Sequence, residues 1–235
     1  MNALRHFFTY AVLAWGLFAG AVQAQSSPVV VELFTSQGCS SCPPADALLH
    51  ELAKRDDVIA LALHVDYWDY IGWKDQFADP AHSERQRAYA VTAGRRSIYT
   101  PQMIVNGQTS VVGARAMELS DAIAAHRAKE SSVTLEIERV ADTVSIRARS
   151  DARVPDGMVV HVLRYQTARD IQILRGENAG RQMTYANVVE DWRVWTEWTG
   201  QSPLVTSVDV DGDAPVVVIV QGADQGPILA AAQLR

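Results

Sequence analysis

Apolar residues in the first half of the chain form strand-like runs separated by helix-like segments. The continuous β-branched and apolar runs at 29–34 and 58–65 are typical of buried strands. The segments between and after them predict helices over about residues 44–54, 80–93 and 117–129.

Two shorter strands, 102–105 and 108–113, flank Asn106-Gly107, which is a strong hairpin signal. A helix joins the strands at 29–34 and 58–65, so these should pair in parallel, whereas the hairpin strands should pair antiparallel. Residues 25–130 therefore predict an α/β domain with a mixed sheet and flanking helices.

From Ser131 onwards the pattern changes to short alternating segments separated by turns such as Pro155-Asp156-Gly157. These segments predict strands near residues 133–138, 143–149, 158–165, 181–189, 193–198 and 215–220. Short strands with regular turns favour an antiparallel, sandwich-like β domain over residues 131–235.

Residues 1–24 have the pattern of a signal peptide. Arg5 precedes an apolar run at 11–19, and Val22-Gln23-Ala24 is a small-residue cleavage pattern. An uncleaved membrane anchor is the competing interpretation, but the run is short for a bilayer. We expect cleavage after Ala24 and a periplasmic or secreted protein without a stable membrane anchor.

The charge of the chain argues against nucleic acid as a partner. The formal net charge is −6. Residues 1–24 carry one Arg and no acid, so the cleaved chain would carry −6 − 1 = −7. Phosphate contacts need clustered Lys and Arg, and the sequence contains no basic block or stripe.

The chain has two cysteines, Cys39 and Cys42, placed between a predicted strand and a predicted helix. A disulfide that closes so short a loop stabilises little through loop entropy, which favours a functional role. Unpaired N–H groups and the positive dipole end of a helix stabilise a thiolate, so the pKa of the first cysteine should fall. We therefore assign Cys39 as nucleophile and Cys42 as the resolving cysteine, with no dissociable cofactor.

Two alternatives to catalysis remain open. A soft metal such as copper would suit a binding module built from Cys39, Cys42 and His64. A structural zinc site would need a further close pair of ligands, which the sequence lacks. The second alternative is a protein-binding module in which the disulfide is a fixed feature.

With Thr100-Pro101 opening a strand before a hairpin, the Cys-x-x-Cys turn resembles the thioredoxin superfamily. The resemblance implies that Pro101 is a cis-proline lying against the disulfide and assisting catalysis. It also implies that Thr100 offers its backbone to a bound peptide. The alternative is that Pro101 merely starts an edge strand.

Four segments narrow this resemblance to an uncharacterised family of secreted, thioredoxin-like bacterial proteins, named only as a domain of unknown function. They are residues 32–46, 64–70, 99–102 and 176–181. Ordinary thioredoxins have Trp before the first cysteine and Gly-Pro between the cysteines. In this chain Gly38 precedes the first cysteine, and Ser40-Ser41 lies between the two cysteines. Because the intervening residues help to set the reduction potential, the sequence does not show whether the pair oxidises or reduces its substrate.

Several residues near the predicted strand ends have competing interpretations. Asp66 and Trp68 would shape a substrate groove beside Cys39, or would cap the core. Asp66 is also a candidate proton acceptor for Cys42. His64 and Glu32 are interpreted as structural, although a buried Glu32 could shuttle a proton.

The turn-rich segment 176–181 predicts a hairpin loop, with a contact near Cys39 as the alternative. Taken together, the sequence predicts thiol–disulfide exchange with a protein or small-thiol substrate, and a redox partner that recycles the cysteine pair.

Overall fold

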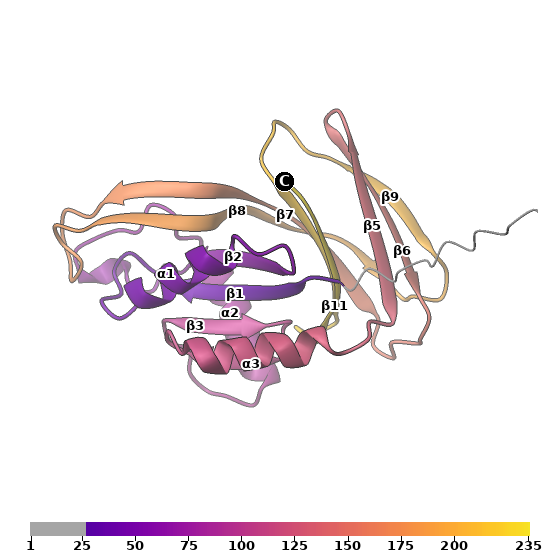
Figure 1. The fold of residues 1–235 in the computed structure, drawn as a ribbon, viewed down its shortest axis with the longest axis horizontal. Helices are drawn as coiled ribbons and strands as arrows, with labels where there is room; N and C mark the ends of the chain where they lie inside the picture. Colours follow the sequence, from indigo (N-terminus) through magenta and orange to yellow (C-terminus); the bar gives the residue numbers. More distant parts are fainter. Residues whose placement is uncertain (1–26) are drawn as a thin grey trace, which may run out of the picture.

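The computed structural model describes residues 27–235, so the predicted signal peptide lies outside the described residues. The fold is built on an eight-stranded mixed sheet of order β11-β10-β7-β8-β2-β1-β3-β4 (Figure 1). A second sheet of order β5-β6-β9 is antiparallel throughout. The first-half strands are β1 (Val29–Thr35), β2 (Val58–His64), β3 (Gln102–Val105) and β4 (Thr109–Val112). The others are β5 (Val133–Val140), β6 (Thr143–Ser150), β7 (Met158–Gln172), β8 (Gln182–Trp198), β9 (Leu204–Asp209), β10 (Val216–Gly222) and β11 (Ile228–Leu234).

The centre of the large sheet agrees with the predicted pairing. Strand β1 pairs in parallel with β2 and antiparallel with β3, and β3 pairs antiparallel with β4. Every residue of β1 and β2 is buried, which explains their unbroken apolar runs.

Helices cover both faces of this central region. They are α1 (Pro43–Leu52), α2 (Pro80–Thr92) and α3 (Ala116–Arg127), with a short 3-10 turn, η1 (Asp69–Ile71). Leu49 of α1 and Ile123 of α3 share one apolar cluster with Val31 of β1. Tyr89 of α2 belongs to the cluster on the opposite face, with Phe34. Within residues 27–235, no helix has both the length and the apolar character needed to cross a bilayer.

The second half of the chain differs from the sequence-based prediction in three strands. Two strands were not predicted, and one long strand was predicted as two shorter ones. Segments 181–189 and 193–198 were expected as separate strands, but they form the single strand β8. The register between β8 and β7 shifts twice, so that Glu190 and Trp195 have no partner residue on β7. Each such bulge interrupts the alternation of inward and outward side chains by which a strand is recognised in a sequence. The unpredicted strands are β9 and β11; the latter has three consecutive alanines, which favour strands poorly.

The large sheet continues across the predicted domain boundary, which falls between α3 and β5. Strand β8 pairs in parallel with β2 at Ala62 and Val188. The β5-β6-β9 sheet packs against the far end of the large sheet through a cluster that includes Val144, Val160 and Val218. The hairpin of β7 and β8 thus belongs to the second half of the sequence but reaches the region around α1 (Figure 1).

Candidate functional site

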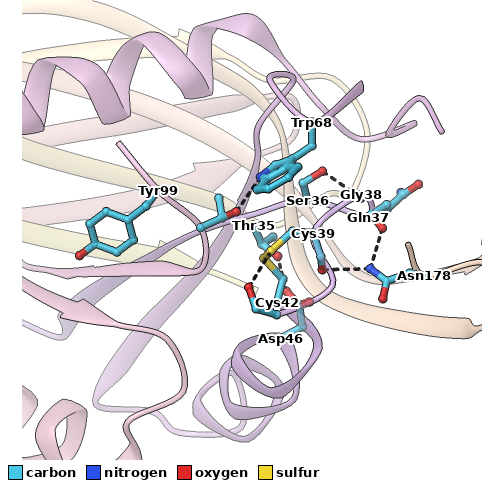
Figure 2. Close-up of a disulfide and its surroundings, with 12 residues drawn as sticks. Thr35, Ser36, Gln37, Gly38, Cys39, Cys42, Asp46, Trp68, Tyr99 and Asn178 are labelled. Atoms are coloured by element: carbon cyan, nitrogen blue, oxygen red, sulfur yellow. Dashed lines mark hydrogen bonds between the residues drawn. A yellow bond between two sulfur atoms is a disulfide. The ribbon is translucent and has the colours of Figure 1, made fainter. Parts of the chain in front are cut away.

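The cysteine pair lies at the junction between β1 and α1. Cys39 and Cys42 form a disulfide, and Cys42 is the N-cap residue of α1 (Figure 2). Pro43 and Pro44 follow in the first turn, where a missing N–H breaks no helical hydrogen bond. The N–H of Cys42 donates to the carbonyl of Cys39 at 3.2 Å, which closes the turn between them.

Gln37 is the point at which the loop before Cys39 is fixed. It is fully buried, its N–H donates to Asp75 Oδ2, and its side-chain Oε1 accepts from the Trp73 indole, both at 2.7 Å. Asn178 donates from Nδ2 to the carbonyls of Gln37 and Cys39, both at 2.9 Å (Figure 2). Segment 176–181 is the loop of the β7–β8 hairpin and also contacts the cysteine loop, so both interpretations of it are confirmed.

The Thr100–Pro101 peptide is cis, in agreement with the resemblance. Gln102, the next residue, pairs with Phe34, so the proline and the cysteine loop lie at the same end of the sheet. Strand β3 lies between β1 and β4, which excludes the alternative that Pro101 starts an edge strand.

Loop residues after β2 pack over the approach to the disulfide. The Trp68 indole donates to Thr100 Oγ1 at 2.7 Å, and a Cβ on Gly38 would stand 3.1 Å from Trp68 Cβ. Cys39 is only 1% exposed and Cys42 is fully buried, although Ser40 and Ser41 between them are exposed. Access to Cys39 therefore requires movement of a covering side chain.

Asp46 is a buried carboxyl group directly after the cysteine pair, on the first turn of α1. Its N–H donates to the Cys42 carbonyl, Oδ1 accepts from Thr35 Oγ1 at 2.7 Å, and Oδ2 has no partner. Burial raises the pKa of Asp46 to about 7, against the opposing effect of His64. No local sequence pattern marks Asp46 as functional, because an acid in a first helical turn is ordinary.

His64, at the end of β2, is fully buried and donates from Nδ1 to Asp75 Oδ2 at 2.8 Å. Burial would raise the pKa of Asp75, but His64 and the backbone N–H groups of Gln37 and Phe77 hold it below its usual value. Within residues 27–235, no cluster of three or more His, Cys, Asp or Glu is arranged to hold a metal ion. The geometry thus gives no support to a metal site of Cys39, Cys42 and His64.

The two other acids considered from the sequence have partners of their own. Asp66 accepts a hydrogen bond from Ser83 on α2. Glu32 is fully buried, pairs with Arg85 at 2.6 Å and accepts from the Tyr89 hydroxyl at 2.6 Å. Asp46, whose N–H donates to the Cys42 carbonyl, lies beside Cys42 in Figure 2.

Comparison with known proteins places these features in a family. The chain is similar to a protein from Agrobacterium tumefaciens of known crystal structure, with 32% identity and a TM-score of 0.75, covering 90% of this chain and 96% of that one. It is similar in fold to HBP35 of Porphyromonas gingivalis, with 16% identity and a TM-score of 0.58, covering 89% and 75% of the two chains. No curated protein matches. Residues 30–221 match the family described as Protein of unknown function (DUF1223), and the chain belongs to that family.

Proposed function

We propose that this protein catalyses thiol–disulfide exchange through Cys39 and Cys42, in a thioredoxin-like arrangement. The observation that carries the proposal is the cysteine pair at the start of α1, at the same sheet end as the cis Thr100–Pro101 peptide. The parallel β1–β2 pair, the antiparallel β1–β3–β4 pairing and helices on both faces are consistent with it.

In the reducing direction, the thiolate of Cys39 attacks a sulfur of a substrate disulfide, and a mixed disulfide forms as the other substrate sulfur leaves as a thiolate. The thiolate of Cys42 then attacks Cys39 Sγ, so the Cys39–Cys42 disulfide forms and the substrate dithiol leaves. In the oxidising direction the same steps run in reverse. A separate redox partner restores the starting state of the pair.

The attack by Cys42 requires that its thiol lose a proton in a buried position. Asp46 is suited to accept this proton, because its Oδ2 has no partner and its pKa of about 7 leaves both protonation states accessible near neutral pH. In the proposed mechanism Asp46 takes the place that the sequence analysis gave to Asp66.

The proposed substrate groove is lined by four further residues: Pro101, Thr100, Trp68 and Asp66. Pro101 and Thr100 would present the substrate chain to Cys39, and Trp68, which now bonds Thr100, would have to turn aside first. Asp66 would line the same groove from the loop after β2. The substrate is a protein or a small thiol, and the working compartment is the periplasm or the exterior, after cleavage behind Ala24.

The test is turnover of a disulfide-bonded model protein, insulin, with dithiothreitol as the reductant. Wild-type protein should accelerate insulin reduction, and Cys39→Ser should abolish the acceleration. Cys42→Ser should accumulate a mixed disulfide between Cys39 and the substrate, seen as a thiol-sensitive adduct by mass spectrometry.

The converse assay, oxidation of a reduced model protein in a glutathione buffer, reports the opposite direction of electron flow. The proposal fails if folded wild-type protein is no faster than Cys39→Ser in both assays. The mass of the protein recovered from a periplasmic fraction tests export separately, because cleavage after Ala24 would leave Gln25 as the first residue.

A further inference from the structure

The tip of the β7–β8 hairpin reaches the cysteine loop from a distant part of the sequence. Residues 173–181 form a compact turn in which the N–H of Gly180 donates to Ile173 and the N–H of Ile173 donates to Arg181. Gly176, at a φ of +79°, approaches the loop after β2 so closely that a Cβ would stand 3.2 Å from Trp73 Cβ. The tip is therefore seated against the site rather than free in solvent.

Asn178 is the residue through which the tip binds the cysteine loop. It is 2% exposed, and both hydrogens of its amide nitrogen are donated to carbonyls of the loop, those of Gln37 and Cys39. The Cys39 carbonyl is the one that accepts the N–H of Cys42. One side chain thus holds the group that closes the turn between the cysteines.

Among the side-chain hydrogen bonds to this loop described above, this contact is the one made to the backbone of Cys39 itself. Asp75 and Trp73 hold Gln37, two residues earlier. The ease with which two thiols form a disulfide depends on how well the backbone presents them to one another. A turn fixed at the Cys39 carbonyl raises the effective concentration of one thiol beside the other.

We infer that Asn178 is a positioning residue that stabilises the Cys39–Cys42 disulfide against reduction, and that reduction in turn loosens the hairpin tip. The second statement follows from the first by linkage, because a contact that favours the disulfide must itself be favoured by it. The inference rests on the cysteine pair of the proposed function but requires no substrate protein.

The measurement is the equilibrium of the pair with glutathione. Reduced Cys39 and Cys42 and one glutathione disulfide give the protein disulfide and two glutathione molecules, so both thiol protons and the two electrons pass to glutathione. Protein is equilibrated over a range of glutathione ratios, quenched in acid, and its free thiols are mass-tagged. Asn178→Ala should lower the equilibrium constant about tenfold, which is about 30 mV towards easier reduction.

Asn187→Ala is the matched control. Asn187 lies on β8, is 7% exposed, and donates from Nδ2 to the carbonyl of Ala60 at 2.8 Å, so its loss also removes a buried amide contact. It should leave the equilibrium constant unchanged within about twofold. If the two variants shift the constant equally, Asn178 is a structural residue only and the inference is overturned.

Hydrogen exchange of the wild-type protein keeps the inference testable if Asn178→Ala does not fold. Amides of residues 173–181 should exchange faster after reduction, while those of the β5–β6 hairpin should not change. Equal exchange of the tip in both redox states overturns the inference. Neither measurement depends on turnover, so failure here is distinguishable from failure of the insulin assay.

Discussion

The indole Nε1 of Trp68 donates to the hydroxyl of Thr100 at 2.7 Å, which joins the loop after β2 to the residue before the cis-proline. In Figure 2 the Trp68 indole and Asp46 lie on opposite sides of the disulfide. Since Cys39 is only 1% exposed, we expect this hydrogen bond to hold the site closed in the disulfide form, so that a reductant reaches the sulfur only when the loop opens.

Trp68→Phe should therefore speed reduction of the disulfide by dithiothreitol. The change removes one hydrogen bond of about 1 kcal/mol from the closed state, which corresponds to about a fivefold higher rate of access. Stopped-flow mixing under pseudo-first-order conditions gives this rate directly.

Trp195→Phe is the control for Trp68→Phe. Its indole also donates to a threonine hydroxyl, that of Thr206 at 3.2 Å, but between β8 and β9. Its rate should match wild type. A Trp68→Phe rate that also matches wild type would show that this hydrogen bond does not limit access.

A second prediction concerns how the free energy of unfolding depends on pH through Asp46. Its carboxyl has a pKa of about 7 in the folded protein and an ordinary value of 3.8 in the unfolded chain. The folded state thus binds the proton of Asp46 more tightly, so the contribution of this group to stability is fully present below about pH 4 and is lost as pH rises through about 7. Asp46→Asn removes this dependence and should be more stable than wild type at pH 8, by up to about 4 kcal/mol.

Urea unfolding of the oxidised protein at pH 5 to 8 measures the difference between wild type and Asp46→Asn. Asp57→Asn is the control, because the pKa of Asp57 is shifted in the opposite direction: hydrogen bonds from Arg55 and Arg127 lower it to about 2. Its difference from wild type should stay constant over this range, since Asp57 loses its contribution only at lower pH. A constant difference for Asp46→Asn as well would refute the raised pKa of Asp46.

The sequence predicted the central sheet and the cysteine turn because these depend on local signals. The apolar run of β1, the Pro43-Pro44 start of α1 and the Asn106-Gly107 hairpin each mark an element within a few residues. The hairpin also shows the limit of such signals, since β4 begins at Thr109 rather than at residue 108.

The roles of Asp46, Gln37 and Asn178 depend on contacts that no local pattern records. Gln37 and Asn178 are 141 positions apart, and each is an ordinary turn residue where it stands. Asp46 differs from any first-turn acid only through its burial beside Thr35. The contact between Gln37 and Asn178 becomes predictable only once the pairing of β8 with β2 is known, and a single residue pair, Ala62 with Val188, defines that pairing.

A last prediction concerns the buried ion pair of Glu32 and Arg85, which stabilises the strand leading to the cysteine loop. Glu32 lies on β1, in the strand that ends at the cysteine loop, and Arg85 lies on α2; their side chains are 0% and 8% exposed. Arg85 also stacks over the Trp192 ring at 4.1 Å and donates to Gln221 on β10. Arg85→Met should therefore cost about 3–5 kcal/mol of unfolding free energy, because it leaves the Glu32 carboxylate buried without its counter-charge.

The exposed pair of Arg115 and Glu118 is the control, with side chains 64% and 48% exposed. Arg115→Met should cost less than about 1 kcal/mol in the same urea titration, since water and salt screen an exposed pair. Glu32→Gln combined with Arg85→Met should recover part of the loss, because no uncompensated charge then remains inside. If the double variant recovers no stability, the cost of Arg85→Met comes from losing the packing of Arg85 on Trp192 and its hydrogen bond to Gln221, and not from the unpaired charge of Glu32.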